Sequence, residues 1–157
     1  MADTITMRPI GRVISDRTEP IDDDWDSIAA RIELDPAQFT AEALMGLESF
    51  SHTEIVFLFD RVPDAKIETG ARHPRGNPDW PRIGIFAQRG KNRPNRIGVT
   101  ACRVLKVDGL TLHVAGLDAI NGTPVLDIKP VMSGFAPRGP VTEPDWASAL
   151  MQGYWSR

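Results

Sequence analysis

The sequence predicts a mainly β domain: a single closed or nearly closed β-barrel with short helices and a C-terminal helical tail. Three observations support this prediction. Short runs rich in β-branched and aromatic residues recur along the chain, turn residues separate them, and segments with helical periodicity are few. Such a pattern is typical of all-β barrels. We expect one domain, in which the barrel covers residues 1–135 and the tail covers residues 136–157.

The first half of the chain contains three expected strands and one expected helix. Apolar residues at 9–15 and alternation at 31–34 predict two short strands. Residues 36–47 are expected to form a brief helix, with Asp35 as its cap. The β-branched and aromatic run at 54–59 predicts a strand that is buried on both faces.

The second half begins with a segment rich in proline and glycine, 62–82, which predicts a long loop. Strand-like runs then return at 83–87, 97–107, 111–115 and 125–128. Asp108-Gly109 lies between two of these runs and is the strongest hairpin signal in the chain. The chain is expected to finish with a short helix over residues 145–155.

The composition excludes several classes of protein. No apolar run approaches the ~20 residues that a membrane-spanning helix needs, and the N-terminus lacks the basic start and apolar core of a signal peptide. We therefore expect a cytoplasmic protein without a membrane partner. Cys102 is the single cysteine, and the three histidines lack the spacing of metal ligands. The sequence also has no Walker-type phosphate loop and no G-x-G-x-x-G turn, so neither a metal site nor a dinucleotide site is predicted.

Charge is distributed unevenly along the chain, whose net charge is −3. Residues 1–60 carry 4 basic and 13 acidic side chains, residues 61–103 carry 10 and 3, and residues 104–157 carry 4 and 5. A basic middle third indicates an electropositive surface suited to phosphate or carboxylate. The alternative, equally open from charge alone, is that the basic and acidic blocks pair with each other in the fold.

The densest basic segment is QRGKNRPNRIG at 88–98, which places four cations in eleven positions with no acid among them. Proline fixes the backbone at its Arg-Pro-Asn turn, and asparagine tolerates unusual backbone angles. The segment is interpreted either as a binding loop for an anion or as a surface loop that pairs with the N-terminal acids.

Three segments resemble a known family: GLESFSHTEIVFLFDR at 46–61, GIFAQRGKNRPNRIGVT at 84–100 and GLDAINGTPVLDIKP at 116–130. Together with the opening PIGRVIS, they resemble the TsaA/TrmO family. Asn121 stands where members usually have aspartate, and Val131 stands where they usually have tyrosine. The chain also lacks the C-terminal extension of many bacterial relatives, and we expect this to affect tRNA recognition more than cofactor binding.

The resemblance, which spans about residues 8–131, implies a methyltransferase that acts on the N6 nitrogen of threonylcarbamoyladenosine in tRNA, beside the anticodon. It implies S-adenosyl-L-methionine (S-adenosylmethionine) as cofactor, and tRNA and a second copy of the chain, in a homodimer, as partners. The acceptor nitrogen is conjugated to the purine and to a urea carbonyl. Its proton must therefore be removed, or its developing anion stabilised, as the methyl group leaves the sulfonium in line. Guanidinium groups suit the substrate's carboxylate and phosphates.

The candidate site residues are those that match the family motifs. The resemblance implies cofactor contacts from Asp60, Arg61, Arg89, Val99, Gly116, Leu117 and Asp118. Substrate or tRNA contacts are expected from Lys91, Arg93, Asn95 and Arg96. The candidate catalytic residues are Asp118, Asp127 and Lys129.

The roles of the two aspartates stay open at this stage. Asp118 follows a strand end and precedes a turn that contains glycine, which favours a ribose or ammonium partner. Asp127 and Lys129 share one face of a strand. Three roles are open for them: a structural ion pair, a pair in which Asp127 orients Lys129, and a group that transfers a proton. Two other functions also stay open: a barrel that binds a cofactor or RNA without catalysis, and a methyltransferase with a different small acceptor.

Overall fold

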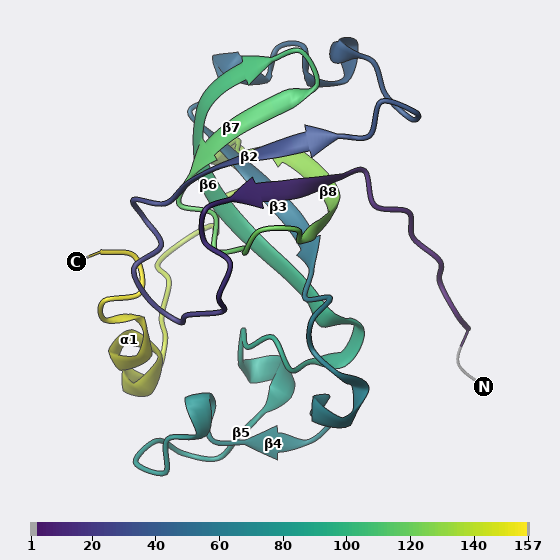
Figure 1. The fold of residues 1–157 in the computed structure, drawn as a ribbon. Helices are drawn as coiled ribbons and strands as arrows, with labels where there is room; N and C mark the ends of the chain where they lie inside the picture. The colour runs from purple at the N-terminus through teal and green to yellow at the C-terminus, as the bar shows by residue number, and fades with distance from the viewer. Residues whose placement is uncertain (1–2, 157) are drawn as a thin grey trace.

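The structure, a computed structural model, describes residues 3–156. Six strands close into one antiparallel barrel in the order β1-β2-β7-β6-β3-β8, as predicted (Figure 1). Gly11 of the first strand pairs with Val125 of the last and closes the barrel. The barrel strands are β1 (Gly11–Ser15), β2 (Ala29–Leu34), β3 (His52–Leu58), β6 (Ile97–Asp108), β7 (Thr111–Ala115) and β8 (Pro124–Pro130).

The longest strand, β6, forms the predicted hairpin with β7. Asp108 pairs with Thr111 across the turn, and Gly109 has a φ of 59°, a left-handed conformation that favours glycine. At the other end of β6, a Cβ atom on Gly98 would lie 2.6 Å from the ring of Phe57. Glycine at this position therefore lets β6 approach the core.

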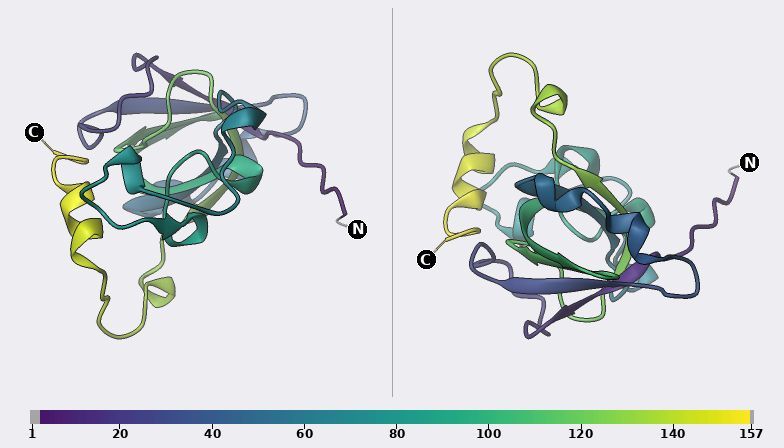
Figure 2. Two further views of the ribbon diagram at one scale, coloured as in Figure 1. Left: turned by 90° about the horizontal axis from the view of Figure 1, so that it is seen from below. Right: turned by 90° about the horizontal axis from the view of Figure 1, so that it is seen from above.

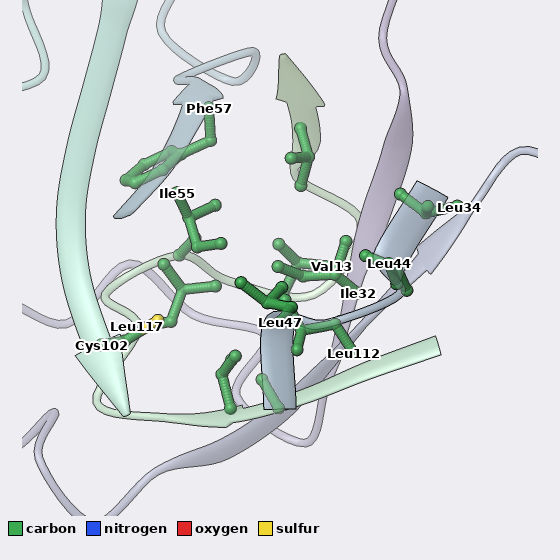
Figure 3. Close-up of a cluster of buried hydrophobic side chains, with 14 residues drawn as sticks. Val13, Ile32, Leu34, Leu44, Leu47, Ile55, Phe57, Cys102, Leu112 and Leu117 are labelled. Atoms are coloured by element: carbon green, nitrogen blue, oxygen red, sulfur yellow. The ribbon is translucent and has the colours of Figure 1, made fainter. Parts of the chain in front are cut away.

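Apolar side chains from alternate positions of the strands fill the barrel interior (Figure 3). Along β3, Ile55 and Phe57 are buried in the core, whereas Glu54, on the outer face of the strand, is exposed to solvent. The prediction that 54–59 is buried on both faces is therefore wrong, because the outer face of this antiparallel barrel stays partly open to solvent. The buried residues labelled in Figure 3 are Val13, Ile32, Leu34, Leu44, Leu47, Ile55, Phe57, Cys102, Leu112 and Leu117.

The segment between β3 and β6 forms a lobe beyond one end of the barrel, here called the basic lobe (residues 61–96; Figure 1). The predicted loop at 62–82 carries β4, which pairs with β5 in a two-stranded sheet. The strand predicted at 83–87 is only two residues long, because the chain turns at Ile85 and buries that side chain. The lobe contains β4 (Ala71–Arg72), β5 (Ile83–Gly84) and 3₁₀ turns at Asp64–Lys66, Pro74–Gly76, Ile85–Ala87 and Pro94–Arg96.

The helix predicted over 36–47 is wrong in type, since the segment contains 3₁₀ turns instead. Asp35 accepts a hydrogen bond from the amide two residues later, which makes a local turn and not an α-helical cap. Gly46 has a φ of 92° and interrupts the helical path. The turns in this part of the chain span Ala41–Leu44 and Leu47–Ser49, and a further one spans Ser133–Phe135.

The C-terminal tail is tied to the barrel by backbone hydrogen bonds. Helix α1 spans Asp145–Met151 and is shorter than the predicted 145–155, because Gly153 takes a left-handed φ of 75°. The amides of residues 24–26 donate to the carbonyls of residues 153–155 at 2.7 to 3.2 Å. Both views in Figure 2 place α1 beside the barrel. Among the described residues, no helix has both the length and the apolar character to cross a bilayer.

Candidate active site

The arginine-rich loop is held in shape by its own polar side chains. Arg93 donates from Nη1 to the carbonyl oxygen of Gln88 at 2.6 Å. The buried Gln88 amide in turn donates to the carbonyls of Arg72 and Ile83 at 3.0 and 2.8 Å. Asn95 has a φ of 61°, the left-handed conformation that asparagine tolerates. The Arg-Pro-Asn turn is therefore well supported, and one nitrogen of Arg93 is used to support it.

Three side chains of this loop remain exposed. Arg89 donates from Nη2 to the carbonyl oxygen of Val99 at 2.9 Å, with its guanidinium at the surface. The Val99 side chain faces outward from β6 and is 39% exposed. Asn95 is exposed at the turn, and the exposed Lys91 side chain makes no ion pair or hydrogen bond within residues 3–156. Arg89 and Lys91 thus present positive charge, and no acid among residues 3–156 forms an ion pair with either of them.

Arg96 joins the loop to the end of β3. Its Nη1 donates to the carbonyl of Val62 at 2.7 Å and to Asp64 Oδ1 at 3.0 Å, while its own carbonyl accepts from the amide of Phe59. Asp60 and Arg61 lie directly after this junction, and both side chains are exposed. Arg61 donates to the carbonyl of Thr18 at 3.2 Å, and so lies beside the acidic N-terminal connection.

The acidic and basic blocks pair only to a small extent. In the described part of the chain, two ion pairs join residues 61–103 to the N-terminal block, namely Arg75 with Asp23 at 3.0 Å and Arg103 with Asp26 at 2.6 Å. Most of the basic lobe's excess charge is therefore not neutralised by the N-terminal acids. This favours an anion-binding surface over the pairing alternative.

Asp118 lies at the centre of a second polar group. Its Oδ1 accepts a hydrogen bond from the Thr100 hydroxyl, and its Oδ2 accepts one from the Tyr154 hydroxyl. Burial, followed by the charge of Asp118, raises the pKa of the Cys102 thiol to about 12. Burial and the same carboxylate raise the pKa of Tyr154 well above the ordinary phenol value. Cys102 and Tyr154 therefore stay protonated at neutral pH, and neither is an activated nucleophile or base.

Gly116 and Leu117 lead into Asp118. Gly116 has a φ of 82°, and its amide donates to the carbonyl of Ile28 at 3.0 Å. The Leu117 side chain is fully buried in the core, so only its backbone is available for a ligand (Figure 3). A cavity of about 410 Å³ opens beside Gly116, within the size range of small-molecule sites. It is lined by Asp26, His52, Ala101, Cys102, Arg103, Ala115, Gly116 and Trp155.

Asp127 and Lys129 lie on the outer wall of the barrel. Their side chains form an ion pair at 3.3 Å, and both are at least half exposed. Asp127 pairs with Val56 of β3. The neighbours of Val56 point into the core, so Val56 and the Asp127 carboxylate face outward. Thr100, the partner of Asp118, instead points inward. The structure therefore places Asp127 and Asp118 on different sides of the barrel wall.

Thr100 and Tyr154, the two donors to Asp118, were not among the predicted site residues. Tyr154 lies 36 residues from Asp118 in the chain, and no pattern in the sequence links them. Thr100 looks like any alternating residue of a strand. Only the closure of the barrel and the return of the tail bring these hydroxyls to the carboxylate.

The sequence model of the tRNA-methyltransferase O N-terminal domain matches residues 16–136. The chain belongs to this family. All the predicted site residues fall within the matched segment, whereas Tyr154 and the rest of residues 137–157 lie outside it. The matched segment thus covers the basic lobe and every barrel strand except β1 (Gly11–Ser15) of this TrmO-type domain.

Known relatives agree with this assignment. A human tRNA (adenine(37)-N6)-methyltransferase is 40% identical over 102 residues, which are 65% of this chain and 23% of the human protein. A probable S-adenosyl-L-methionine-binding protein of Pyrococcus abyssi is 35% identical over 136 residues, 83% of this chain and 70% of that protein. A crystal structure of TrmO from P. aeruginosa superposes with a TM-score of 0.75 at 28% identity, and covers 93% of this chain and 63% of that one. The chain thus spans about a quarter of the human relative.

Proposed function

We propose that this chain is an S-adenosylmethionine-dependent methyltransferase that acts on the N6 nitrogen of threonylcarbamoyladenosine at position 37 of tRNA. The observation that carries the proposal is the match to the tRNA-methyltransferase O N-terminal domain over residues 16–136. The names of the relatives support the same chemistry, since the human relative is named for methylation of tRNA adenine 37 and the archaeal one for the cofactor.

The cofactor would be held by residues of the basic lobe, of strand β6 and of the segments that follow β3 and β7. Arg89 would approach the methionine carboxylate or a neighbouring anion, because its guanidinium is exposed and has no acid partner in the described part of the chain. Asp118 would accept from the ribose or ammonium group, with its carboxylate already oriented by two hydroxyls. Asp60, Arg61, Val99 and the backbone at Gly116 and Leu117 would complete this set.

The tRNA would approach the basic lobe. Lys91 and Asn95 are the exposed groups of the loop that would contact phosphate or the modified base. Arg93 and Arg96 would contribute mainly by shaping the loop, because both already donate to backbone carbonyls. The exposed Asp127–Lys129 ion pair supports an orienting role for Asp127. Removal of the acceptor proton by that carboxylate is the less favoured assignment.

The departures from the family pattern leave the local structure intact. Asn121 accepts the Ser15 amide on its Oδ1 at 3.1 Å, and an aspartate oxygen would accept the same bond. Val131 forms its backbone hydrogen bond with the carbonyl of His52 at 3.0 Å, independently of its side chain. These contacts support retention of the family's function, and we extend the proposal to a cytoplasmic homodimer in which the tail and the barrel form one domain.

A barrel that binds cofactor or RNA without catalysis is the second candidate function, because the archaeal relative, which is 35% identical over 83% of this chain, is named only for binding S-adenosyl-L-methionine. Calorimetric titration with S-adenosylmethionine tests the cofactor assignment first. The proposal expects saturable binding that S-adenosylhomocysteine competes away. An absence of binding would exclude methyl transfer to tRNA and to any other acceptor. Binding without methyl transfer would favour the second candidate.

A further inference from the structure

We infer that Tyr154 is a positioning residue for the cofactor site, so that the C-terminal tail is a working part of that site. The inference rests on the proposed function, because Asp118 is a member of the proposed cofactor set. Its structural basis is the hydrogen bond from the Tyr154 hydroxyl to Asp118 Oδ2. The tail lies outside the segment that matches the family, so the family assignment does not account for this contact.

The two carboxylate oxygens of Asp118 are oriented by donors from two separate segments, strand β6 and the C-terminal tail. Thr100, fixed within the buried face of β6, donates to Oδ1, while Tyr154 of the tail donates to Oδ2. A carboxylate that accepts one bond on each oxygen has its rotation restricted. Each oxygen keeps a second lone pair, so Asp118 is oriented by these donors and remains able to accept from a ligand.

The position of Tyr154 is itself well determined. The amide of Trp25 donates to the Tyr154 carbonyl at 3.0 Å, and the amide of Asp26 donates to the Trp155 carbonyl at 2.7 Å. The rings of Tyr154 and Trp155 meet edge to face with centroids 4.8 Å apart. Asp26 is further held by Arg103, which donates to its Oδ1 at 2.6 Å and its carbonyl at 2.7 Å. The hydroxyl is therefore presented by a fixed backbone and not by a free chain end.

The same tail borders the cavity beside the cofactor segment. Trp155 and Gly116 line one cavity of about 410 Å³, and Gly116 lies two residues before Asp118. The tail thus contacts the proposed site at two adjoining points. The Tyr154 hydroxyl donates to Asp118, and Trp155 forms part of the cavity wall. A positioning residue must contact the site directly, and these two contacts meet that requirement.

The test compares S-adenosylmethionine affinity of the full chain and of Tyr154→Phe, which keeps the ring and removes the hydroxyl. We expect the variant's Kd to rise on the order of ten-fold, the size expected for a lost hydrogen bond to a charged group. Ser148→Ala is the matched control, since it removes another tail hydroxyl, one that donates to Glu143 at 2.6 Å away from the site. Its Kd should equal that of the unmodified chain.

A double-mutant cycle separates positioning from folding. If Tyr154 acts through Asp118, Tyr154→Phe should have no further effect on Kd in an Asp118→Asn background, with circular dichroism confirming that all variants are folded. A wild-type chain that binds the cofactor, together with Tyr154→Phe that binds equally or more tightly, overturns this inference alone. Full additivity in the cycle also overturns it. A wild-type chain that does not bind the cofactor overturns the proposed function and this inference with it.

Discussion

Arg89 donates from Nη2 to the carbonyl oxygen of Val99 at 2.9 Å and so connects the exposed end of the basic loop to strand β6. Arg89 and Val99 are ten positions apart in the chain, and β6 continues from Val99 to the hairpin that returns through β7 toward Gly116. A loop arginine held in this way keeps a fixed location while its charge stays available to a ligand.

Replacing Arg89 with alanine should weaken S-adenosylmethionine binding about ten-fold and leave the barrel folded. An exposed arginine that donates to one carbonyl contributes little to stability, so the free energy of unfolding should change by less than about 0.5 kcal/mol. Calorimetry and thermal unfolding measure the two effects. Arg31→Ala, an exposed arginine of β2 that pairs with Glu33, is the control. Loss of melting temperature with unchanged affinity would make Arg89 a structural residue.

The affinity for tRNA should fall steeply as salt is added, because the basic lobe would displace counterions from phosphates. Lys91→Ala should flatten the dependence of log affinity on log salt by about one unit. Lys106→Ala provides the comparison, since Lys106 lies in β6 outside the lobe and pairs with Asp108 at 3.7 Å. If the affinity for tRNA did not depend on salt, the loop would not contact tRNA phosphates and only its proposed role in cofactor binding would remain.

Arg96→Ala should behave differently from Lys91→Ala. Its guanidinium holds the Val62 carbonyl and Asp64, so the substitution should cost about 1 kcal/mol of stability in addition to any loss of tRNA affinity. Denaturant unfolding of the two variants gives the comparison. Equal stabilities would show that the contacts of Arg96 do not support the loop.

The alkaline titration of Tyr154 should depend on Asp118. Tyr154 is the only tyrosine, so near-ultraviolet phenolate absorbance reports it alone. Burial and Asp118 raise its pKa above 10.0, so the folded chain keeps the proton that the unfolded chain releases. The stabilisation that this one group contributes is therefore fully present below pH 10.0 and is lost as the pH rises from there through the pKa of the folded chain. Asp118→Asn should lower the phenol pKa, and an unchanged titration would refute the contact.

The two aspartates should separate in single-turnover methylation at saturating cofactor. Asp118→Asn should weaken cofactor binding and largely keep the methylation rate at saturating cofactor, as expected for a residue that binds the cofactor without taking part in the chemical step. Asp127→Asn should have a small effect if the residue only orients Lys129. A fall in rate on the order of 10²–10⁴-fold for Asp127→Asn, with cofactor affinity unchanged, would instead identify it as the general base.

The barrel was predictable because its signals are local. Alternation in 97–107 and the Asp108-Gly109 turn fix strand faces and a hairpin within a few residues, and β6 and β7 form as expected. The predicted helix at 36–47 failed because the Asp35 side chain forms a local turn at its start and Gly46 takes a left-handed conformation near its end.

The site was predictable only in part, and for a physical reason. The family motifs mark Arg89 and Asp118, but sequence spacing does not reveal that Asp127 faces the outer wall while Asp118 accepts from an inward hydroxyl. The contact of Tyr154 with Asp118 depends on where the tail returns, and that path is set by backbone hydrogen bonds to residues 24–26. Long-range closure of this kind leaves no periodic pattern in the sequence.

Methyl transfer itself tests the central claim most directly. The purified chain would be incubated with S-adenosylmethionine labelled in its methyl group and with tRNA that does or does not carry threonylcarbamoyladenosine at position 37, the tRNA position in the human relative's name. After digestion to nucleosides, mass spectrometry locates the label. The account predicts label on the N6 nitrogen of the modified adenosine and none on unmodified tRNA. A chain that binds the cofactor but transfers no methyl group to the modified tRNA would contradict it.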